Sequence, residues 1–252
     1  MKYFGITDRG LVRKNNQDSY VIASNQADDI LAIVADGIGG NLGGDIASRL
    51  AVSHFSRAFS EVESFSGERE IVEWIEEHVE RANTLIFEYG KKHIQLKGMG
   101  TTLCAAMLTK FGTFVINIGD SRCYSWSKEL GLKQITIDHT LLNDMLAHGE
   151  LKPEEAKTFT KKNVLTNALG VWETVKADID IHHETMQGLL LCSDGLHGYV
   201  SERDINNVLF NTDLDVSLKP RKLLKYALEA GGFDNITIIL IDFEGDNTYG
   251  KE

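Results

Sequence analysis

The amino-acid sequence predicts an α+β fold, a four-layer α-β-β-α sandwich of two antiparallel β-sheets flanked by helix pairs. Many short runs rich in β-branched residues are joined by mostly short connections, which favours antiparallel pairing. Two long amphipathic segments follow one another between two groups of such runs, as expected of helices that cover a sheet. With 252 residues, two prolines and no low-complexity linker, the chain is expected to form one domain.

The predicted strands are short runs bordered by turn-forming residues. In chain order they are Tyr3–Thr7, Ser19–Ser24, Ile30–Ala35, Thr101–Thr109, Thr113–Ile118, Arg122–Trp126, Leu132–Thr136, Ala177–Ile181, Gly188–Cys192 and Asn235–Asp242. The predicted helices have apolar residues at helical spacing or helix-end residues at their borders. They are Gly44–Phe59, Glu68–Lys91, Thr140–His148, Glu202–Leu209 and Pro220–Ala230.

Composition excludes several classes of protein. The net charge of -11 argues against nucleic acid or an anionic membrane as the main partner, since both attract basic surfaces. Cys104, Cys123 and Cys192 lie in or beside apolar runs and are expected to be reduced core residues. The start of the chain is too short for a signal peptide, and no apolar run approaches the roughly 18 residues of a membrane span. We therefore expect a cytoplasmic protein.

Acidic residues stand where buried strands are expected to meet turns. Asp36, Asp120 and Asp194 follow apolar runs, and Asp18 and Asp234 precede predicted strands. Because one strand starts beside the end of its antiparallel neighbour, these five side chains are expected to share one sheet end. A single Asp-Gly pair is more often a turn than a ligand, so the prediction depends on the repetition.

Five carboxylates beside apolar strands would repel one another and be costly to desolvate. Bound cations would relieve both costs, and all-oxygen ligands favour Mg²⁺ or Mn²⁺ over zinc. The glycine after Asp36, Gly37, leaves room for its carbonyl to coordinate an ion. The sequence therefore predicts a metal site built from carboxylates.

The motifs around these acids occur in a fixed order. They are Arg13-Lys14-Asn15-Asn16-Gln17-Asp18, Asp36-Gly37-Ile38-Gly39-Gly40, Gly100-Thr101-Thr102, Asn117-Ile118-Gly119-Asp120-Ser121-Arg122, Asp138-His139, Leu165-Thr166-Asn167-Ala168-Leu169-Gly170, Cys192-Ser193-Asp194-Gly195-Leu196 and Asp234-Asn235-Ile236-Thr237. In order and spacing the series resembles the PP2C-type (PPM family) metal-dependent protein serine/threonine phosphatases of bacteria. The resemblance covers nearly the whole chain and implies the PP2C-like sandwich already predicted.

The resemblance also implies roles for individual residues. Asp36 would bridge two core ions, with the Gly37 carbonyl on one of them, and Asp194 and Asp234 would hold the other. Asp18 would act through metal-bound waters, Asp120 would form a weaker third site with Asp194, and Arg13 would clamp the substrate phosphate. Eukaryotic members often carry Glu in place of Gln17 and His in place of Ile38, and that histidine is a proposed general acid. The proton for the leaving group is therefore expected from elsewhere here.

These roles give a specific functional hypothesis. A hydroxide bridging two Mn²⁺ or Mg²⁺ ions would attack the phosphorus of phosphoserine or phosphothreonine directly, while Arg13 neutralises the phosphate oxygens. The expected partners are phosphoproteins, a Ser/Thr protein kinase and its substrates, and the expected state is a monomer. Residues 1–243 would form the phosphatase domain, 139–162 a flap that helps to select substrate, and 244–252 a polar tail.

Two alternatives and one residue stay open at this stage. The chain could be a phosphoprotein-binding regulator that has lost catalysis, or a different two-metal phosphoesterase, such as a nuclease or small-molecule phosphatase. His139 follows Asp138 in a family motif, and a helix-start role is as plausible for it as a catalytic one. His54, His78 and His93 fall on predicted helices, where surface positions are expected.

Overall fold

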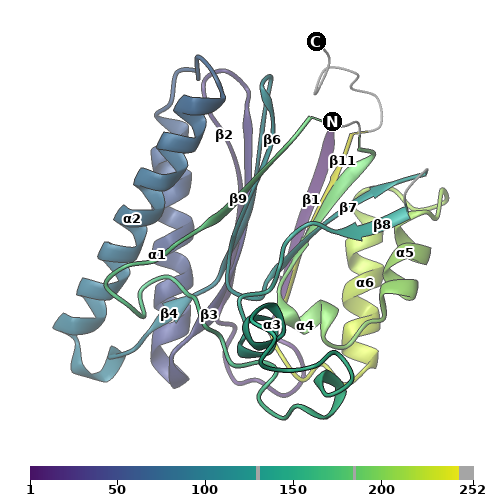
Figure 1. Cartoon of the computed structure of the whole chain (residues 1–252). Coiled ribbons are helices and arrows are strands. Elements are labelled where there is room, and N and C mark those ends of the chain that lie inside the picture. Colours follow the sequence, from purple (N-terminus) through teal and green to yellow (C-terminus); the bar gives the residue numbers. More distant parts are fainter. Residues whose placement is uncertain (129–130, 184–185, 244–252) are drawn as a thin grey trace.

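Two antiparallel β-sheets lie face to face between layers of helices in the computed structural model, so the predicted sandwich is confirmed (Figure 1). The structure describes residues 1–128, 131–183 and 186–243; the predicted tail, 244–252, lies outside the described residues. The first sheet has the order β1-β11-β10-β7-β8, and the second β2-β3-β5-β6-β9 with β4 paired to β3.

The strand bounds are close to those predicted. The first sheet contains β1 (Lys2–Asp8), β11 (Ile236–Asp242), β10 (Gly188–Cys192), β7 (Arg122–Ser127) and β8 (Gly131–Gln134). The second contains β2 (Asp18–Ser24), β3 (Ile30–Ile38), β4 (Gly100–Thr101), β5 (Leu103–Thr109), β6 (Gly112–Ile118) and β9 (Asp178–His182). The single strand predicted over Thr101–Thr109 is two strands, because the Thr102 backbone N–H turns to donate to the Asp36 carbonyl at 2.8 Å.

Helices cover the outer face of each sheet. On the second sheet lie α1 (Gly40–Ser60) and α2 (Glu68–Lys92), and on the first lie α4 (Asp194–His197), α5 (Glu202–Leu209) and α6 (Leu218–Glu229). The predicted end of α1 and both predicted ends of α2 differ from the observed ones by one residue at most. The start of α1 lies four residues earlier than expected, inside the glycine run. Gly39 precedes it with a φ of 122°, a conformation that favours glycine. The short helix α4 was not predicted.

Three hydrophobic layers hold the sandwich together. Strand β3 shows how its residues divide by alternation: Leu31 and Ile33 pack toward α1 and α2, while Ala32 and Val34 pack against the other sheet. All three cysteines are buried and free, as predicted. His78 is also buried, at 8% exposure, which corrects the expected surface position; it packs against Trp74 with ring centroids 4.3 Å apart.

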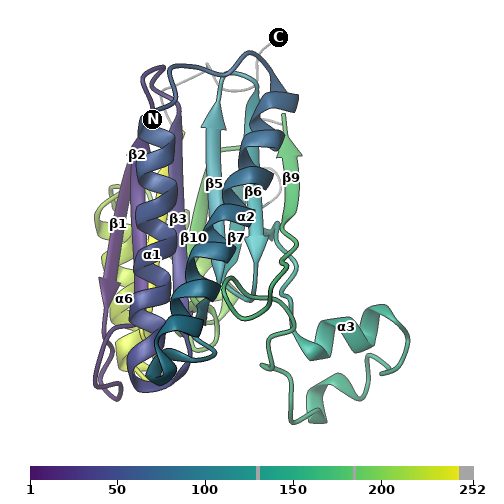
Figure 2. The same cartoon turned by 90° about the vertical axis from the view of Figure 1, so that its left-hand side faces the viewer.

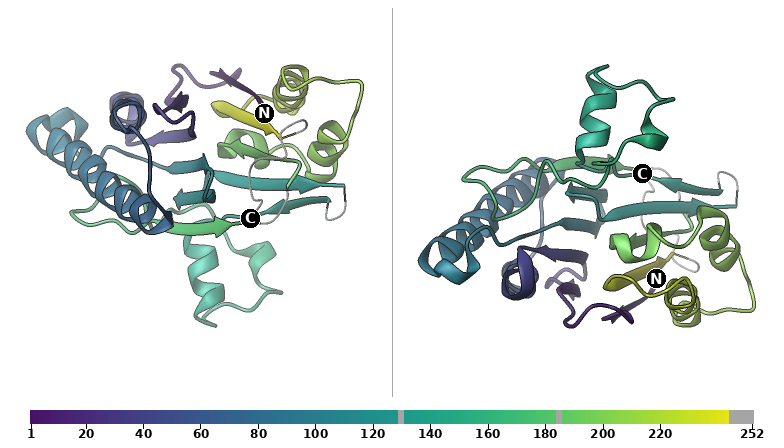
Figure 3. Two further views of the ribbon diagram at one scale, coloured as in Figure 1. Left: turned by 90° about the horizontal axis from the view of Figure 1, so that it is seen from above. Right: turned by 90° about the horizontal axis from the view of Figure 1, so that it is seen from below.

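One segment projects from this body. It contains α3 (Leu141–Ala147) and the short 3₁₀ helix η2 (Ala156–Thr158). A second 3₁₀ helix, η1 (Ile94–Leu96), follows α2 outside this segment. Figures 2 and 3 show that the α3 segment extends away from both helix layers. No residue from 141 to 164 is buried, so this part of the chain contributes nothing to the core. Among the described residues, no helix is long and apolar enough to cross a membrane.

Candidate functional site

The predicted carboxylates come together at facing ends of the two sheets rather than at the end of one sheet. Asp18 and Asp36 are direct partners in the β2–β3 register, and Asp120 follows β6 of the same sheet. Asp194 follows β10, and Asp234 precedes β11, in the other sheet. Asp36 is repelled by four other carboxylates, which come from both sheets, so the site is shared between the sheets. They are Asp18, Asp120, Asp194 and Asp234.

Burial and mutual repulsion make four of these carboxyl groups, those of Asp18, Asp36, Asp120 and Asp194, weak acids. Loss of solvent is the largest cause for each, and neighbouring carboxylates add to it. The pKa of Asp36 is raised well above its ordinary value. The pKa is raised to about 7 for Asp18, to about 7 for Asp120 and to about 6 for Asp194. Burying several carboxylates side by side is unfavourable when all are charged, so the cluster needs protons or cations to be stable at neutral pH.

Asp18 shows how one of these groups is oriented. Its Oδ2 accepts hydrogen bonds from Ser193 Oγ and Thr237 Oγ1, both at 2.7 Å. Its Oδ1 is buried without a hydrogen-bond partner in the described structure, and so is Oδ1 of Asp194. A buried carboxylate oxygen without a donor is costly, and a hard cation is the partner that suits it.

The donor set therefore fits Mn²⁺ or Mg²⁺. It consists of carboxylate oxygens, without the thiolate or imidazole ligands typical of zinc sites. Within the described ranges, no three His, Cys, Asp or Glu side chains already enclose one point as a cage for an ion. Water molecules and backbone oxygens would have to complete the coordination, as is common for Mg²⁺.

The Gly100-Thr101-Thr102 motif fixes the backbone of Asp36. Thr102 Oγ1 accepts from the Asp36 N–H at 2.9 Å, and Thr102 N donates to the Asp36 carbonyl at 2.8 Å. Thr101 Oγ1 donates to the same carbonyl at 2.9 Å. The motif was recognised in the sequence without a role, and its role is to hold the end of β3.

Gly37 is required by close approach. A Cβ on Gly37 would lie 2.1 Å from the Gly44 carbonyl oxygen, and its N–H donates to the Gln17 carbonyl at 3.1 Å. Only a residue without a side chain allows the end of β3 and the first turns of α1 to touch here. The close approach thus joins β3 directly to the start of α1, which begins within the glycine run.

Arg13 lies beside the carboxylates on the loop between β1 and β2. Its Nη2 donates to Asp234 Oδ2 at 2.7 Å, while the guanidinium side chain remains 52% exposed. The hydrogen bond with Asp234 is the main cause that raises the pKa of Arg13, so its charge is permanent. An exposed, permanently charged guanidinium next to these carboxylates can meet an incoming anion.

Asn235 organises the loop that carries Arg13. Its Nδ2 donates to the carbonyls of Arg9 at 2.8 Å and Asn15 at 3.0 Å, and its Oδ1 accepts from Gln17 N at 2.8 Å. Sequence reasoning gave no role to Asn235, Ser193 or Thr237. The available signal was their place in the motifs, next to or within three residues of Asp194 or Asp234.

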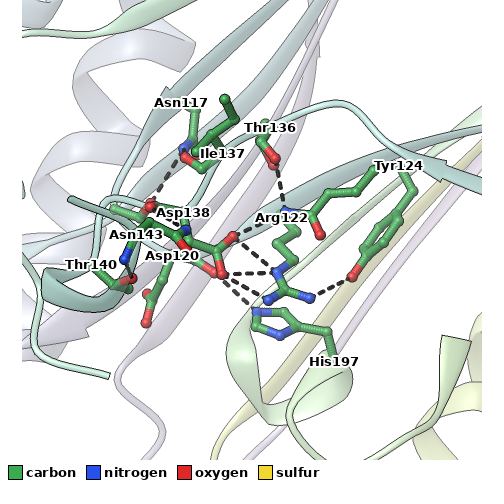
Figure 4. A network of polar contacts seen from close by, with 12 residues as sticks. Asn117, Asp120, Arg122, Tyr124, Thr136, Ile137, Asp138, Thr140, Asn143 and His197 are labelled. Carbon is green, nitrogen blue, oxygen red and sulfur yellow. Dashed lines mark hydrogen bonds and ion pairs between the residues drawn. The ribbon is translucent and has the colours of Figure 1, made fainter. Parts of the chain in front are cut away.

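A cavity of about 750 Å³ opens beside Asp120 and Asp194. Arg122 and Asp138 line it, and Figure 4 shows these two side chains facing each other; their closest contact is 2.7 Å, between Arg122 Nη2 and Asp138 Oδ2. Lys162 and Asn163 of the projecting segment also line the cavity. The segment predicted as a flap therefore borders the space next to the carboxylates.

Comparison with known proteins gives a consistent result. Residues 12–226 match the family model of protein phosphatase 2C. The serine/threonine phosphatase stp of Listeria welshimeri serovar 6b is 37% identical over 237 residues, which cover 94% of this chain and 93% of that protein. Serine/threonine phosphatase Stp1 from Staphylococcus aureus has a similar structure, with a TM-score of 0.89 and 30% identity over 97% of this chain and 95% of that one.

A further solved structure is that of the catalytic domain of serine threonine protein phosphatase PstP in complex with two manganese ions. It has a TM-score of 0.79 and 30% identity, and covers 96% of this chain and 97% of that one.

Proposed function

Because the chain belongs to the protein phosphatase 2C family, we propose that it is a metal-dependent protein serine/threonine phosphatase that hydrolyses phosphoserine and phosphothreonine in proteins. One observation carries the proposal: buried carboxylate oxygens without donors lie at the facing sheet ends where Arg13 presents its charge. The manganese ions of the PstP structure support the same chemistry.

The metal ligands of this proposal are those expected from the sequence. Asp36 would contact both core ions, the Gly37 carbonyl one of them, and Asp194 and Asp234 the other; Asp18 would act through water, and Asp120 with Asp194 would form a third site. When bound, Mn²⁺ or Mg²⁺ would supply charge neutralisation and a water of lowered pKa at neutral pH. Ser193 and Thr237 keep the Asp18 carboxylate in place by donating to its Oδ2.

Arg13 binds the substrate phosphate in this proposal. Its two-pronged guanidinium matches two phosphate oxygens, and its exposure leaves it accessible to a phosphorylated side chain. Asp234 holds the guanidinium in the direction of the carboxylates until the phosphate replaces it as a partner.

The thiols of the chain have no part in the reaction. Burial raises the pKa of Cys192 to about 12, and Cys104 and Cys123 are also buried. A thiolate nucleophile is therefore not available at neutral pH. This supports direct attack by water over a cysteinyl-phosphate intermediate.

The projecting segment would contact the protein around the phosphorylated residue, because Lys162 and Asn163 line the cavity beside Asp120 and Asp194. We expect the enzyme to act as a monomer, opposing a Ser/Thr protein kinase by dephosphorylating the kinase and its substrates.

Phosphate release from a phosphothreonine peptide tests the function. The assay compares Mn²⁺, excess EDTA and the Asp36→Asn variant, with double-stranded DNA and a small phosphate ester as alternative substrates. We expect release with Mn²⁺ that is lost in both controls. No release with any divalent ion, from folded protein, would contradict the proposal and favour a phosphoprotein-binding regulator.

A further inference from the structure

The turn that carries Asp120 is held on both sides by residues outside the proposed metal site. On the side before Asp120, Gly119 N donates to His139 Nδ1 at 3.2 Å, and His139 N donates to the Gly119 carbonyl at 2.9 Å. On the side after it, the Asp120 carbonyl lies 3.0 Å from His197 Nε2. The backbone on either side of the Asp120 side chain is thus fixed by a histidine.

The hydrogen bonds define which nitrogen of His139 carries the proton. Nδ1 faces two N–H donors, the Gly119 backbone at 3.2 Å and Asn167 Nδ2 at 3.0 Å, so it must be the unprotonated acceptor. Asn167 Nδ2 is oriented as a donor because it also donates to the Lys176 carbonyl at 2.6 Å. The proton is then on Nε2, which donates to Asp178 Oδ2 at 2.9 Å.

Asp178 therefore selects the tautomer that Gly119 needs. It lies on the edge strand β9 with its side chain 50% exposed, whereas the side chain of His139 is 14% exposed. This chain of contacts, from Asp178 through His139 to Gly119, ends one residue before Asp120. It has the form of the outer-shell hydrogen bonds that orient metal ligands in proteins.

The preceding residue strengthens the same arrangement. Asp138 binds the guanidinium of Arg122 through Nε at 2.9 Å and Nη2 at 2.7 Å, as Figure 4 shows. Arg122 stands two residues after Asp120, and Gly119 one residue before it. The dipeptide Asp138-His139 thus contacts the chain on both sides of Asp120, at Gly119 through His139 and at Arg122 through Asp138.

We propose that His139 is a positioning residue for Asp120: through its Nδ1 it fixes the Gly119 peptide and hence the direction of the Asp120 carboxylate. The proposal rests on the metal-binding role proposed for Asp120. It answers the alternatives left open by the sequence, since Thr140 caps α3 and His139 is not among the residues that line the cavity beside Asp120.

Two substitutions separate the two ends of the imidazole. In His139→Asn the amide oxygen occupies the place of Nδ1, so the contact with Gly119 is kept and the contact with Asp178 is lost. In His139→Gln the amide reaches the place of Nε2, so the contact with Asp178 is kept and Gly119 loses its acceptor. A role in positioning Asp120 predicts that Asn is tolerated and Gln is not.

The experiment is a calorimetric titration of metal-free protein with Mn²⁺, combined with thermal unfolding and peptide kinetics. Asp120→Ala identifies the binding event that needs Asp120. We expect His139→Gln to weaken that event by about 10- to 100-fold, the range found for outer-shell partners of metal ligands. The other binding events and the KM for phosphopeptide should stay unchanged, and His139→Asn should bind like wild type.

Asp178→Ala provides a second route if His139→Gln does not fold. Removing this exposed acceptor lets the proton move to Nδ1, so the same binding event should weaken; Asp180→Ala, on the same strand and also exposed, is the matched control. Wild-type affinity in His139→Gln, or in Asp178→Ala where His139→Gln does not fold, would overturn the positioning role, as would an equal loss in Asn and Gln. A wild-type protein that binds no Mn²⁺ would overturn the proposed function itself.

Discussion

Asp18 illustrates how neighbours across a sheet determine the chemistry of a residue. Its Oδ2 is held by hydroxyl donors from β11 and from the end of β10, far away in the sequence. The sequence indicated Asp18, Asp36, Asp120, Asp194 and Asp234 because acids at strand ends repeat. It could not indicate that Ser193 and Thr237 orient Asp18, because a hydroxyl after a buried strand has no pattern of its own.

Arg13 should affect substrate binding more than metal binding. Arg13→Lys keeps the charge but loses the two-pronged contact, so the KM for a phosphothreonine peptide is expected to rise about tenfold, the equivalent of roughly 1.4 kcal/mol for one strong charged hydrogen bond. Mn²⁺ affinity should not fall, because Asp234 loses a competing partner. Steady-state kinetics and calorimetry measure both, with Lys14→Ala as the control. An unchanged KM would exclude the phosphate contact.

Thr102 should be needed for its hydroxyl rather than its methyl group. Thr102→Val leaves the Asp36 N–H without its acceptor at 2.9 Å, which is expected to cost about 1–3 kcal/mol of unfolding free energy. Thr102→Ser keeps the oxygen and should lose less. Chemical denaturation of the two variants provides the measurement, and a Ser variant as unstable as Val would assign the effect to packing instead.

At the scale of elements, sequence patterns predicted the helices and strands well where one rule dominated. The bounds of α5 were predicted correctly because Ser201 accepts from the Asp204 N–H at its start. The start of α1 was missed because glycine has low helix propensity, yet the close contact between Gly37 and Gly44 requires glycine within the helix. Here tertiary packing overrides local preference.

The junction of β3 and α1 should tolerate no side chain at Gly37. In Gly37→Ala the new Cβ would lie 2.1 Å from the Gly44 carbonyl, so the strand end and the helix must separate. We expect lower stability, by about 1–3 kcal/mol as for other overpacked sites, and a loss of Mn²⁺ affinity. Gly67→Ala, where a Cβ meets nothing within 4 Å, is the control. Normal metal binding in Gly37→Ala would contradict the placement of this backbone in the site.

The projecting segment should be separable from the fold. Thr140 and Leu165 pair across its base, and none of residues 141–164 is buried, so a short glycine-rich link between them should preserve the core. We expect unfolding temperatures within a few degrees, retained hydrolysis of a small aryl phosphate, and loss of discrimination among phosphopeptides. Equal peptide selectivity in the shortened protein would show that the flap has no part in substrate choice.

For the whole molecule, the layered arrangement could be predicted from the order of strands and helices and their short connections, but the site could not. Alternating residues of β3 supply two separate cores, a division that the continuous apolar run Leu31–Ala35 does not reveal. The sequence placed the carboxylates at one sheet end, whereas the site needs both sheets. Which strand ends face each other depends on how the sheets stack, and this is set by packing over the whole domain.

The stability of the metal-free protein should fall as pH rises from about 4 to about 7. The pKa of Asp18 is raised to about 7 and that of Asp194 to about 6, so the stability that their protonated forms provide is lost as pH rises through those values. Burial lowers the pKa of His78 to about 4 and that of His197 to about 4, so stability is also lost as pH falls from about 6.5 toward 4. The histidines oppose the carboxyl effect between pH 4 and 6.5 without cancelling it, because the pKa is also raised for Asp36 and Asp120 and the carboxyl groups outnumber the histidines.

Mn²⁺ should offset this loss of stability at higher pH, because a bound cation replaces the protons on the carboxylates. At 100 times its dissociation constant an ion adds about 2.7 kcal/mol, which corresponds to roughly 5–10 °C in unfolding temperature for a chain of this size. Thermal unfolding from pH 5 to 8.5, with Mn²⁺ or with EDTA, should show the largest shift above pH 7 and little below pH 5.5. Asp36→Asn should reduce the shift. A shift of equal size at every pH would mean that Mn²⁺ binds away from these carboxylates.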